Sequence, residues 1–431
     1  MIERYEWSEA ASRERALARP RGREDATLLA GVRTIVENVR DEGWTALVRH
    51  AELIDGATPQ AIAVAPFADQ ARRDFPHATL DAFALAVRNI DAFHRATRPA
   101  DVETEPMPGL RVAKRWTPIA SAGLYVPGGA APLFSTLLML GLPARVAGVD
   151  RLVVVTPPRK GGGLNPAIAL AAEAVGVEQV WAVGGAQAIA ALAFGAKSPT
   201  AKSLTGSDIP AVARICGPGN AWVAAAKALV SSLPGGPAID LPAGPSELMV
   251  IADASADPAT VAADLLSQAE HDPQAQVLLV TPDPALIDAV ERAVAAQIAA
   301  IDNRIFAPVR AIRCASLDEA ATIANTYAPE HLSLATDASE QLLLLCKNAG
   351  AIFVGHSVAE SFGDYLAGSS HVLPTDGAAL AVGGVSTLTF MKETSVQRAS
   401  PAAARALAAP AAALARLEGL EAHARAAELR A

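Results

Sequence analysis

Short apolar runs alternate with Ala-rich stretches along the chain from Lys114 onward. The runs 151–156 and 179–183 are almost continuously apolar, and the stretch 166–175 between them has the composition of a helix. Strands that are apolar on both faces and separated by helices are typical of a parallel sheet covered on both sides. This alternation predicts a doubly wound α/β unit.

A second unit of the same kind follows Asp240. Its expected strands are 247–252, 277–281 and 349–354, and its expected long helix is 284–300. A chain of 431 residues can bury more than one core, because single cores stop growing near about 250–300 residues. The sequence therefore predicts two layered α/β domains, and the cleft between such domains is the default place for an active site.

The two ends of the chain have different patterns. Residues 1–23 are polar and Arg-rich, and we expect an arm that needs a partner surface to become ordered. Apolar residues at helical spacing in 24–54 predict one long helix or two in succession, and 80–97 predicts another helix. The Ala-rich residues 401–429 predict a terminal helix, which would usually cap a domain or form a dimer contact.

Charge and composition argue against several classes of protein. The net charge of −9 is modest, and the sequence has no run of basic residues that could bind along a phosphate backbone. Nucleic acid is therefore not an expected partner. The longest nearly apolar run, 130–144, is shorter than the roughly 20 residues that cross a bilayer. The charged N-terminus lacks the apolar core of a signal peptide. We expect no membrane partner and a soluble, cytoplasmic enzyme acting on a small molecule.

The three cysteines are Cys216, Cys314 and Cys346. They are odd in number, far apart and set in apolar segments, which favours buried free thiols over disulfides or a thiolate zinc site. Any metal is therefore expected to have nitrogen and oxygen ligands.

Three turns at the ends of expected strands are rich in glycine, namely 125–129, 184–187 and 217–220. Ligands of doubly wound units bind at the carboxyl ends of the strands, where such turns allow close approach and helix N-termini favour phosphate. None of the three is the G-x-G-x-x-G fingerprint, and any one of them could be merely a tight turn. Together they favour a nucleotide or phosphate ligand.

The stretch 264–272 places Gln268 and His271 on one face of an expected helix, about one turn apart. This is half of a possible metal site, although such a pair often forms only a solvated face and Gln is an uncommon zinc ligand. Three places downstream offer the other half: Glu330 with His331, Asp364 with His371, and His423.

Each of these places has a second interpretation. The dipeptide Glu330–His331 joins an acid to a base that titrates near neutrality, but it also fits a helix start. Asp364 and His371 lie in a Gly- and Ser-punctuated loop, where an Asx turn and a solvent-facing His are the alternative. His423 by itself belongs to a terminal helix of no assigned chemistry.

Eight ordered blocks of sequence resemble those of the histidinol dehydrogenase family. They are YVPGG, GGAQAIAALAFG, GPGNAWVAAAK, AGPSELMVIAD, DLLSQAEHD, APEHL, NAGAIFVG and GDYLAGSSHVLPT. The resemblance covers most of the chain from about Tyr125 to its end and implies an NAD-dependent, zinc-containing homodimer. Such an enzyme oxidises L-histidinol through histidinaldehyde to L-histidine, in the last steps of histidine biosynthesis.

The resemblance assigns roles to residues of the matching blocks. It implies zinc ligands at Gln268, His271, Asp364 and His423, the last from the other subunit through an exchanged C-terminal segment. It implies an acid/base pair of Glu330 and His331. It implies substrate contacts at Ser246, Gln268, His271, His331, Asp364, His371, Glu418 and His423. It implies NAD contacts at Tyr125, Gln187 and Asn220.

The family's zinc orients substrate and carries no electrons, so the hydrides go to the nicotinamide. His331 is then expected to take the alcohol proton, and Glu330 to activate the water that attacks the aldehyde.

Pattern and resemblance together predict the organisation of the chain. We expect two doubly wound, incomplete Rossmann-like domains with small N-terminal and C-terminal helical extensions involved in dimerisation. The expected boundaries are an arm of 1–23, a zinc and catalytic domain of 24–124 with 246–385, a nucleotide-binding domain of 125–245, and an exchanged C-terminal segment of 386–431.

Two stretches depart from the family pattern. The segment 195–216 looks longer than expected, and 376–395 is Gly-rich where a Ser-containing turn is expected. Two other functions remain open: a zinc and NAD dehydrogenase of the same superfamily that acts on another small alcohol or diol, and a catalytically inactive zinc-binding or nucleotide-sensing paralogue.

Overall fold

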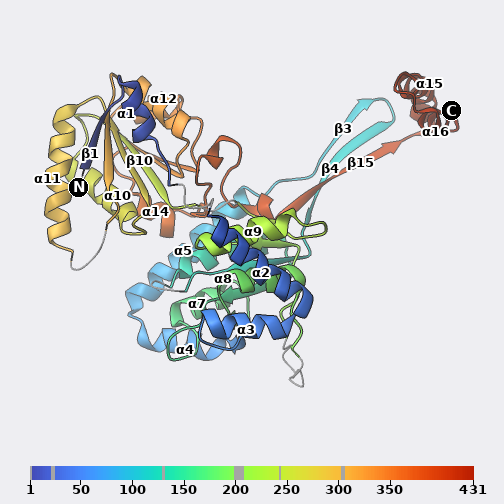
Figure 1. Cartoon of the computed structure of the whole chain (residues 1–431). Coiled ribbons are helices and arrows are strands. Elements are labelled where there is room, and N and C mark those ends of the chain that lie inside the picture. The colour runs from blue at the N-terminus through green and yellow to red at the C-terminus, as the bar shows by residue number, and fades with distance from the viewer. Residues whose placement is uncertain (1, 21–24, 129–131, 199–207, 242–243, 302–305) are drawn as a thin grey trace.

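The computed structural model describes residues 2–20, 25–128, 132–198, 208–241, 244–301 and 306–431. Two six-stranded sheets, each covered by helices, form the two bodies of the molecule (Figure 1). A separate three-stranded sheet extends from them as a long ribbon. The prediction of an α/β fold with two parallel-sheet domains is confirmed.

The first sheet has the strand order β2-β7-β6-β5-β8-β9. All neighbours are parallel except β2, which pairs antiparallel with β7 at the edge. The strands are β2 (Gln60–Ala63), β5 (Ser121–Tyr125), β6 (Arg151–Thr156), β7 (Gln179–Ala182), β8 (Arg214–Cys216) and β9 (Ala238–Ile239). The helices are α2 (Ala26–Glu42), α3 (Trp44–Ile54), α4 (Ala65–Asp74), α5 (His77–Ala96), α6 (Phe134–Ala147), α7 (Pro166–Ala174), α8 (Gly185–Phe194) and α9 (Ala221–Ser232).

Alternating side chains of each strand enter two separate cores. On β6, Val154 packs in the core with α4, α5, α6 and α7, whereas Val153 and Val155 pack in the core with α2, α3, α8 and α9. This alternation is the period of two of a β-strand. It explains why the run 151–156 is apolar almost throughout, because both faces of the sheet are covered.

The second sheet has the strand order β1-β12-β11-β10-β13-β14, and all its neighbours are parallel. The strands are β1 (Ile2–Glu6), β10 (Glu247–Ala252), β11 (Gln276–Thr281), β12 (Val309–Arg313), β13 (His331–Ala335) and β14 (Ala351–Val354). The helices are α1 (Ala10–Ala16), α10 (Pro258–Ala269), α11 (Pro284–Ala299), α12 (Leu317–Tyr327), α13 (Ser339–Leu343) and α14 (Glu360–Tyr365). Short 3-10 turns η1 (Ala378–Leu380) and η2 (Thr387–Phe390) follow. The core between α10, α11 and the sheet is separate from the core that α12 covers.

Several helices start with a capping residue followed by proline. Asn165, Asp257, Asp283 and Ser400 each accept a hydrogen bond from a backbone N–H of the first turn, and a proline follows each of them. The cap satisfies one free N–H of the first turn, and proline has no N–H to leave unpaired there. These dipeptides therefore fix where the helices begin.

The N-terminal residues differ from the predicted arm that needs a partner surface, because they are ordered on the second sheet of the same chain. Residues 2–6 form β1, which pairs with β12 in register Ile2 to Val309, and α1 follows with Ser12 and Ala16 buried. Most of the β1 side chains are exposed and several are charged, because the strand lies at the edge of the sheet. A short polar edge strand lacks the apolar alternation that would have revealed it.

The helices α2 to α5 and the strand β2, which the sequence grouped with 246–385, pack on the first sheet. β2 pairs with β7, and α2 packs against α8 and α9. The apolar stripe of α2, which includes Val32, Val36 and Val39, fills the core of the first sheet. Residues 26–54 form two helices, α2 and α3, because Gly43 between them has a φ of 60°.

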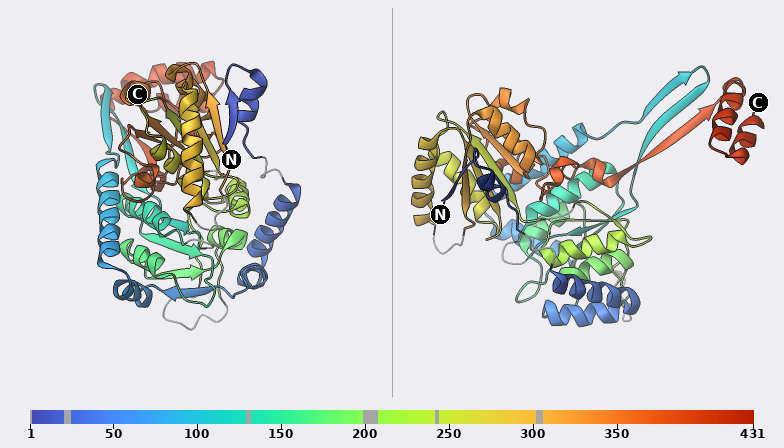
Figure 2. Two further views of the ribbon diagram at one scale, coloured as in Figure 1. Left: turned by 90° about the vertical axis from the view of Figure 1, so that its left-hand side faces the viewer. Right: turned by 45° about the horizontal axis from the view of Figure 1, so that its top comes forward.

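The ribbon consists of β3 (Val102–Met107), β4 (Leu110–Pro118) and β15 (Met391–Ala399) in the antiparallel order β15-β4-β3. It carries α15 (Pro401–Leu417) and α16 (Glu421–Glu428) away from both bodies (Figure 1, and Figure 2, right). The predicted terminal helix is therefore two helices, and the predicted C-terminal helical segment 386–431 includes a strand. Gly419 between the two helices has a φ of 77°.

The two terminal helices expose large apolar side chains. Leu414, Leu417 and Leu429 are 67%, 84% and 86% exposed in the single chain. Within the described residues, no helix has the length and apolar character needed to span a membrane. Cys216, Cys314 and Cys346 are buried and free, as the sequence predicted.

One buried histidine makes folding sensitive to pH. His94 on α5 is 0% exposed, and neither ring nitrogen has a hydrogen-bond partner. Burial lowers its pKa from 6.5 to about 4. The unfolded chain therefore binds more protons than the folded chain between these values, and stability falls as the pH falls through this window.

We predict that His94→Leu stabilises the protein relative to wild type increasingly as the pH falls from 7.5 to 5, by up to about 1.4 kcal/mol per pH unit. Thermal unfolding of both proteins at the two pH values measures the effect. The matched control is His77→Leu, which replaces the exposed histidine at the start of the same helix. A His94→Leu difference that is equal at both pH values would contradict the prediction.

Candidate active site

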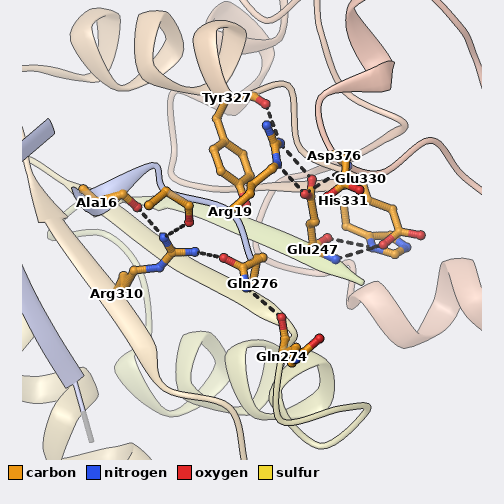
Figure 3. A network of polar contacts seen from close by, with 11 residues as sticks. Ala16, Arg19, Glu247, Gln274, Gln276, Arg310, Tyr327, Glu330, His331 and Asp376 are labelled. Atoms are coloured by element: carbon orange, nitrogen blue, oxygen red, sulfur yellow. Dashed lines mark hydrogen bonds and ion pairs between the residues drawn. The ribbon is translucent and has the colours of Figure 1, made fainter. Parts of the chain in front are cut away.

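The predicted acid/base pair, Glu330 and His331, lies at the start of β13, beside the main chain of β10 (Figure 3). Leu248 pairs with His331 in the sheet, so Glu247 lies next to Glu330 and His331. This is the amino edge of a parallel sheet. The carboxyl edge is the usual ligand site of doubly wound units, so the acid/base pair lies at the opposite edge of its sheet.

Hydrogen bonding selects the tautomer of the neutral His331 ring. Its Nδ1 is 3.0 Å from the main-chain oxygen of Glu247 and 3.3 Å from Oε1 of Glu360. A carbonyl oxygen only accepts, so the proton of a neutral ring is on Nδ1 and the lone pair is on Nε2. Nε2 has no hydrogen-bond partner, and burial lowers the pKa of His331 to about 4. The ring is therefore neutral near pH 7 and has an unoccupied basic nitrogen.

Two buried carboxyl groups flank this ring. Oε2 of Glu330 accepts the main-chain N–H of Glu247 at 2.9 Å, and burial raises the pKa of Glu330 well above its usual range. Glu360 on α14 accepts from the Ser267 hydroxyl at 3.2 Å, and burial raises its pKa as well. The sequence did not single out Glu360. Its spacing of four from Asp364 on one helix was the available signal.

Asp364 lies between the two histidines of the site. Its Oδ1 is 4.0 Å from Nε2 of His331 and 3.9 Å from Nδ1 of His371. His371 donates from Nδ1 to the main-chain oxygen of Asp364 at 3.0 Å, which leaves Nε2 to accept from the Thr136 hydroxyl at 3.3 Å. Burial lowers the pKa of His371. The Asp364 carboxylate raises this pKa, and the nearby His271 lowers it. The structure thus brings Asp364, His331 and His371 together, with His271 nearby.

Gln268 is the most unusual side chain of the group. It is 0% exposed at the last turn of α10, and neither its amide oxygen nor its amide nitrogen has a hydrogen-bond partner. A buried amide without a partner costs roughly 1–3 kcal/mol, which makes it unusual in a folded protein. His271, just beyond the helix, is exposed. The pair lies on the side of the sheet where α10 contacts α14, the helix of Asp364.

These side chains fit a bound cation. Amide oxygen, imidazole nitrogen and carboxylate oxygen are ligands that zinc accepts. Among the described residues, no three His, Cys, Asp or Glu side chains form a metal site by themselves. That result agrees with a set in which Gln268 is one donor and the chain itself supplies only two others, His271 and Asp364.

The remaining predicted substrate and metal residues are divided between two places. Ser246 directly precedes β10, and its main-chain oxygen accepts from the Gln276 N–H at 2.9 Å. Glu418, which directly follows α15, and His423 on α16 are exposed at the far end of the ribbon (Figure 1). A single chain therefore does not bring Glu418 or His423 to the other site residues.

The described residues of the three glycine-rich turns lie at the carboxyl edge of the first sheet, where the sequence analysis expects a ligand. The Tyr125 hydroxyl accepts the Gly185 N–H at 3.3 Å, and burial raises the pKa of Tyr125 to about 12. Gly217 has a φ of 124°, and a Cβ there would clash with the main-chain oxygen of Tyr125. Only glycine fits this turn. Residues 129–131 lie outside the described residues. So do residues 199–207, which belong to the segment 195–216 that looks longer than expected.

Gln187 and Asn220 differ in how they are held. Gln187 is buried, donates from Nε2 to Asp55 at 3.1 Å, and has no partner for Oε1. Asp55 also accepts the Gly184 N–H at 2.9 Å, and it is a residue that the sequence did not single out. Asn220 is exposed and caps α9, since its Oδ1 accepts from two N–H groups of the first turn. The unpaired amide oxygen of Gln187 fits a ligand that donates a hydrogen bond.

A buried ion pair supports the turn that carries Asn220. Lys227 and Asp240 have side chains that are 2% and 1% exposed and form an ion pair. Lys227 donates to the main-chain oxygen of Gly217 at 2.7 Å, and Asp240 accepts the Gly217 N–H at 2.6 Å. The ion pair therefore holds both the backbone N–H and the backbone carbonyl oxygen of Gly217.

Comparison with known proteins gives one consistent family. The family model described as histidinol dehydrogenase matches residues 18–431. The histidinol dehydrogenase of Xanthomonas euvesicatoria pv. vesicatoria (strain 85-10) is 44% identical over 434 residues, covering 99% of this chain and 98% of that protein. That of Idiomarina loihiensis is 42% identical over 443 residues, covering 100% and 96%. The crystal structure of histidinol dehydrogenase from Elizabethkingia anophelis has a TM-score of 0.91 at 34% identity, covering 99% of this chain and 97% of that one.

We predict that Lys227→Met destabilises the protein by about 3–5 kcal/mol, because the buried Asp240 carboxylate loses its counter-charge. Urea unfolding followed by tryptophan fluorescence measures the change. Lys227→Met combined with Asp240→Asn should lose less, since no charge is left buried alone. Lys114→Met, which breaks an exposed pair with Glu393, is the control and should cost less than about 1 kcal/mol. Equal losses for the Lys227 and Lys114 variants would contradict the prediction.

Proposed function

The chain belongs to the histidinol dehydrogenase family, and we propose that it oxidises L-histidinol through histidinaldehyde to L-histidine with NAD as the hydride acceptor. The match to the family over residues 18–431 carries this proposal. The geometry supports it, because buried carboxyl groups lie around the neutral imidazole of His331, and the neighbouring helix α10 carries the buried, unpaired amide of Gln268.

Zinc would be held by Gln268, His271 and Asp364 together with His423 of the partner subunit. The buried, unpaired amide of Gln268 supports a cation at this place, since coordination would remove the cost of burying its oxygen without a partner. The position of α16 at the end of the ribbon supports a partner origin for His423 (Figure 2). The exposed leucines of α15 and α16 support burial of these helices in a homodimer.

The reaction removes two hydrides from one carbon. In the first step the alcohol carbon loses a hydride and its oxygen loses a proton, which gives the aldehyde. Water then adds to the aldehyde, and the resulting hydrate loses a second hydride and a proton to give the acid. When bound, NAD would supply the hydride acceptor for each step, and zinc, which has no accessible redox chemistry, would hold the substrate in one orientation.

His331 supplies the base for both oxidations. Its Nε2 lone pair is free because Nδ1 carries the proton that the Glu247 carbonyl accepts. Nε2 would take the proton of the alcohol as the hydride leaves, release that proton to solvent before the second oxidation, and then take the proton of the hydrate. Asp364, 4.0 Å from this nitrogen, would stabilise the imidazolium that forms.

Glu330 would activate the water that attacks the aldehyde. Burial raises the pKa of its carboxyl group, so the carboxylate is a stronger base than an exposed one once it forms. Its Oε2 is oriented by the Glu247 N–H, which limits the directions from which a water can bind. Ser246, His371 and Glu418 of the partner subunit would contact the substrate.

The nucleotide would bind at the carboxyl edge of the first sheet, with contacts to Tyr125, Gln187 and Asn220. The unpaired Oε1 of Gln187 and the exposed side chain of Asn220 support this placement. Contacts between the two bodies bring this region toward the acid/base pair, because Thr136 on α6 contacts His371. We place the enzyme in the cytoplasm, in histidine biosynthesis.

We predict that wild-type protein forms two NADH for each L-histidinol consumed and that Glu330→Gln approaches one, with histidinaldehyde left over. The aldehyde step should slow by about 100-fold or more and the alcohol step by much less, because only the aldehyde step needs an activated water. NADH absorbance with quantified histidinol and product measures the ratio. Equal slowing of both half-reactions argues against this division of labour. Wild-type turnover of another alcohol, with none of histidinol, would overturn the proposed substrate.

We predict that His271→Asn and His423→Asn are each inactive and that mixing them after subunit exchange restores about a quarter of wild-type activity. Half of the randomly exchanged dimers then contain both variants, and one of their two sites has an intact His271 with an intact partner His423. The control mixes His271→Asn with Asp364→Asn, which damages every site. No recovery in the first mixture would show that one subunit supplies both ligands.

A further inference from the structure

One residue at the start of β10 holds both members of the acid/base pair through its main chain. The Glu247 N–H donates to Oε2 of Glu330 at 2.9 Å, and the Glu247 carbonyl accepts from Nδ1 of His331 at 3.0 Å (Figure 3). The first bond orients the carboxyl group of Glu330. The second selects the tautomer of His331 that has a free Nε2. A small rotation of the peptide groups at Glu247 would disturb both.

The side chain of Glu247 is itself held from several directions. It is 0% exposed, and burial raises its pKa while the Arg19 guanidinium opposes the rise. Nε of Arg19 is 2.6 Å from Oε1 and its second nitrogen is 3.0 Å from Oε2, which is a bidentate pair. The Asp376 N–H also donates to Oε1 at 3.1 Å, so the loop that follows His371 is attached to the same carboxylate.

Arg19 is fixed as firmly as its partner. It also donates to the main-chain oxygen of Tyr327 at 2.6 Å, and its guanidinium lies 3.8 Å from the centre of the Tyr327 ring. The segment before it is held by Arg310, which donates to the carbonyl oxygens of Ala16 and Ala18 at 2.8 and 2.7 Å and pairs with Gln276. Planar, bidentate and stacked contacts of this kind are specific to arginine.

We propose that Arg19 and Glu247 form a positioning pair for the acid/base residues Glu330 and His331. The pair holds the Glu247 side chain, so that the main chain of the same residue keeps its N–H on Glu330 and its carbonyl on His331. Neither residue of the pair contacts the substrate. This inference rests on the proposed function, because it assigns the pair to the oxidation that Glu330 and His331 perform.

A purely structural ion pair would affect stability and leave turnover of the folded enzyme unchanged. A positioning pair affects kcat in the folded enzyme, because misplacing a catalytic group by about 1 Å can cost about 100-fold in rate. It leaves the KM for histidinol and NAD nearly unchanged, since the substrate and cofactor contacts are made by other residues. The split between kcat and KM therefore separates the two roles.

The test compares Arg19→Met, Glu247→Gln, the double variant and Arg19→Lys in the full-length, zinc-loaded enzyme. Assays are run well below the unfolding temperature of each variant, with zinc content measured to show that the ligands are undisturbed. We expect kcat with histidinol to fall about 10- to 100-fold in the two single variants, with both KM values within about twofold of wild type. The two losses should not multiply in the double variant, because both remove the same interaction.

The matched control is Arg4→Met. Arg4 on β1 also connects the N-terminal segment to the body of the second sheet, through an ion pair with Asp288 of α11 at 2.7 Å. Both side chains of this pair are exposed. We expect a wild-type kcat for this variant. A wild-type kcat in folded Arg19→Met and Glu247→Gln would overturn the inference, as would losses that multiply in the double variant.

Arg19→Lys covers the case in which the other variants fail to fold. It keeps the charge and loses the bidentate fork, so we expect kcat to fall by at least about fivefold; an unchanged kcat would overturn the inference. If the wild-type enzyme ignores histidinol, the proposed function fails by itself. The kcat of each variant relative to wild type is then measured with the alcohol that the wild-type enzyme does oxidise.

Discussion

The parallel pairing of β10 with β13 sets the geometry on which the acid/base group depends. It places Glu247 beside Glu330, two residues that are 83 positions apart in the chain. Peptide groups at the ends of strands have hydrogen-bonding capacity that the sheet does not use. At the amino end of β10, the side chains of Glu330 and His331 bind to these groups. A shift of register by one residue would remove both hydrogen bonds and turn the side chains of β13 to the other face.

In the reaction that we propose, the two bodies contribute different edges of their sheets. The first presents the carboxyl edge of its sheet, where Tyr125, Gln187 and the turn at Gly217 lie. The second presents its amino edge, where His331 begins a strand and α10 ends. They are joined by specific contacts, because Asn89 on α5 donates to the Leu366 oxygen at 2.8 Å and Thr136 contacts His371. Hydride transfer between a nucleotide and a substrate needs such fixed relative placement.

Burial governs the chemistry of the site more than exposed charge does. Burial lowers the pKa of His331 and raises those of Glu330 and Glu360, because it disfavours the charged form of each group. It also leaves the amide of Gln268 without a partner. Costs of this kind are typical of functional sites, where stability is lower than the packing would allow. The paired Arg19 and Glu247 nearby are a contrasting case, in which a buried carboxylate has a complete set of partners.

The sequence by itself determined the α/β class, the approximate strands and helices, and the family, because these depend on local periodicity and on short motifs. It also identified His331, Gln268 and Asp364 as residues of interest from their types and spacing. It did not reveal β1, whose polar edge position hides its strand pattern, or the packing of α2 against α8, which depends on contacts between distant segments. The roles of Glu247 and Arg19 were equally hidden, since Glu247 acts through its main chain and Arg19 lies in a segment that looked like an arm in need of a partner surface. Only the tertiary structure decided these points, because register and burial are set by residues that are far apart in the sequence.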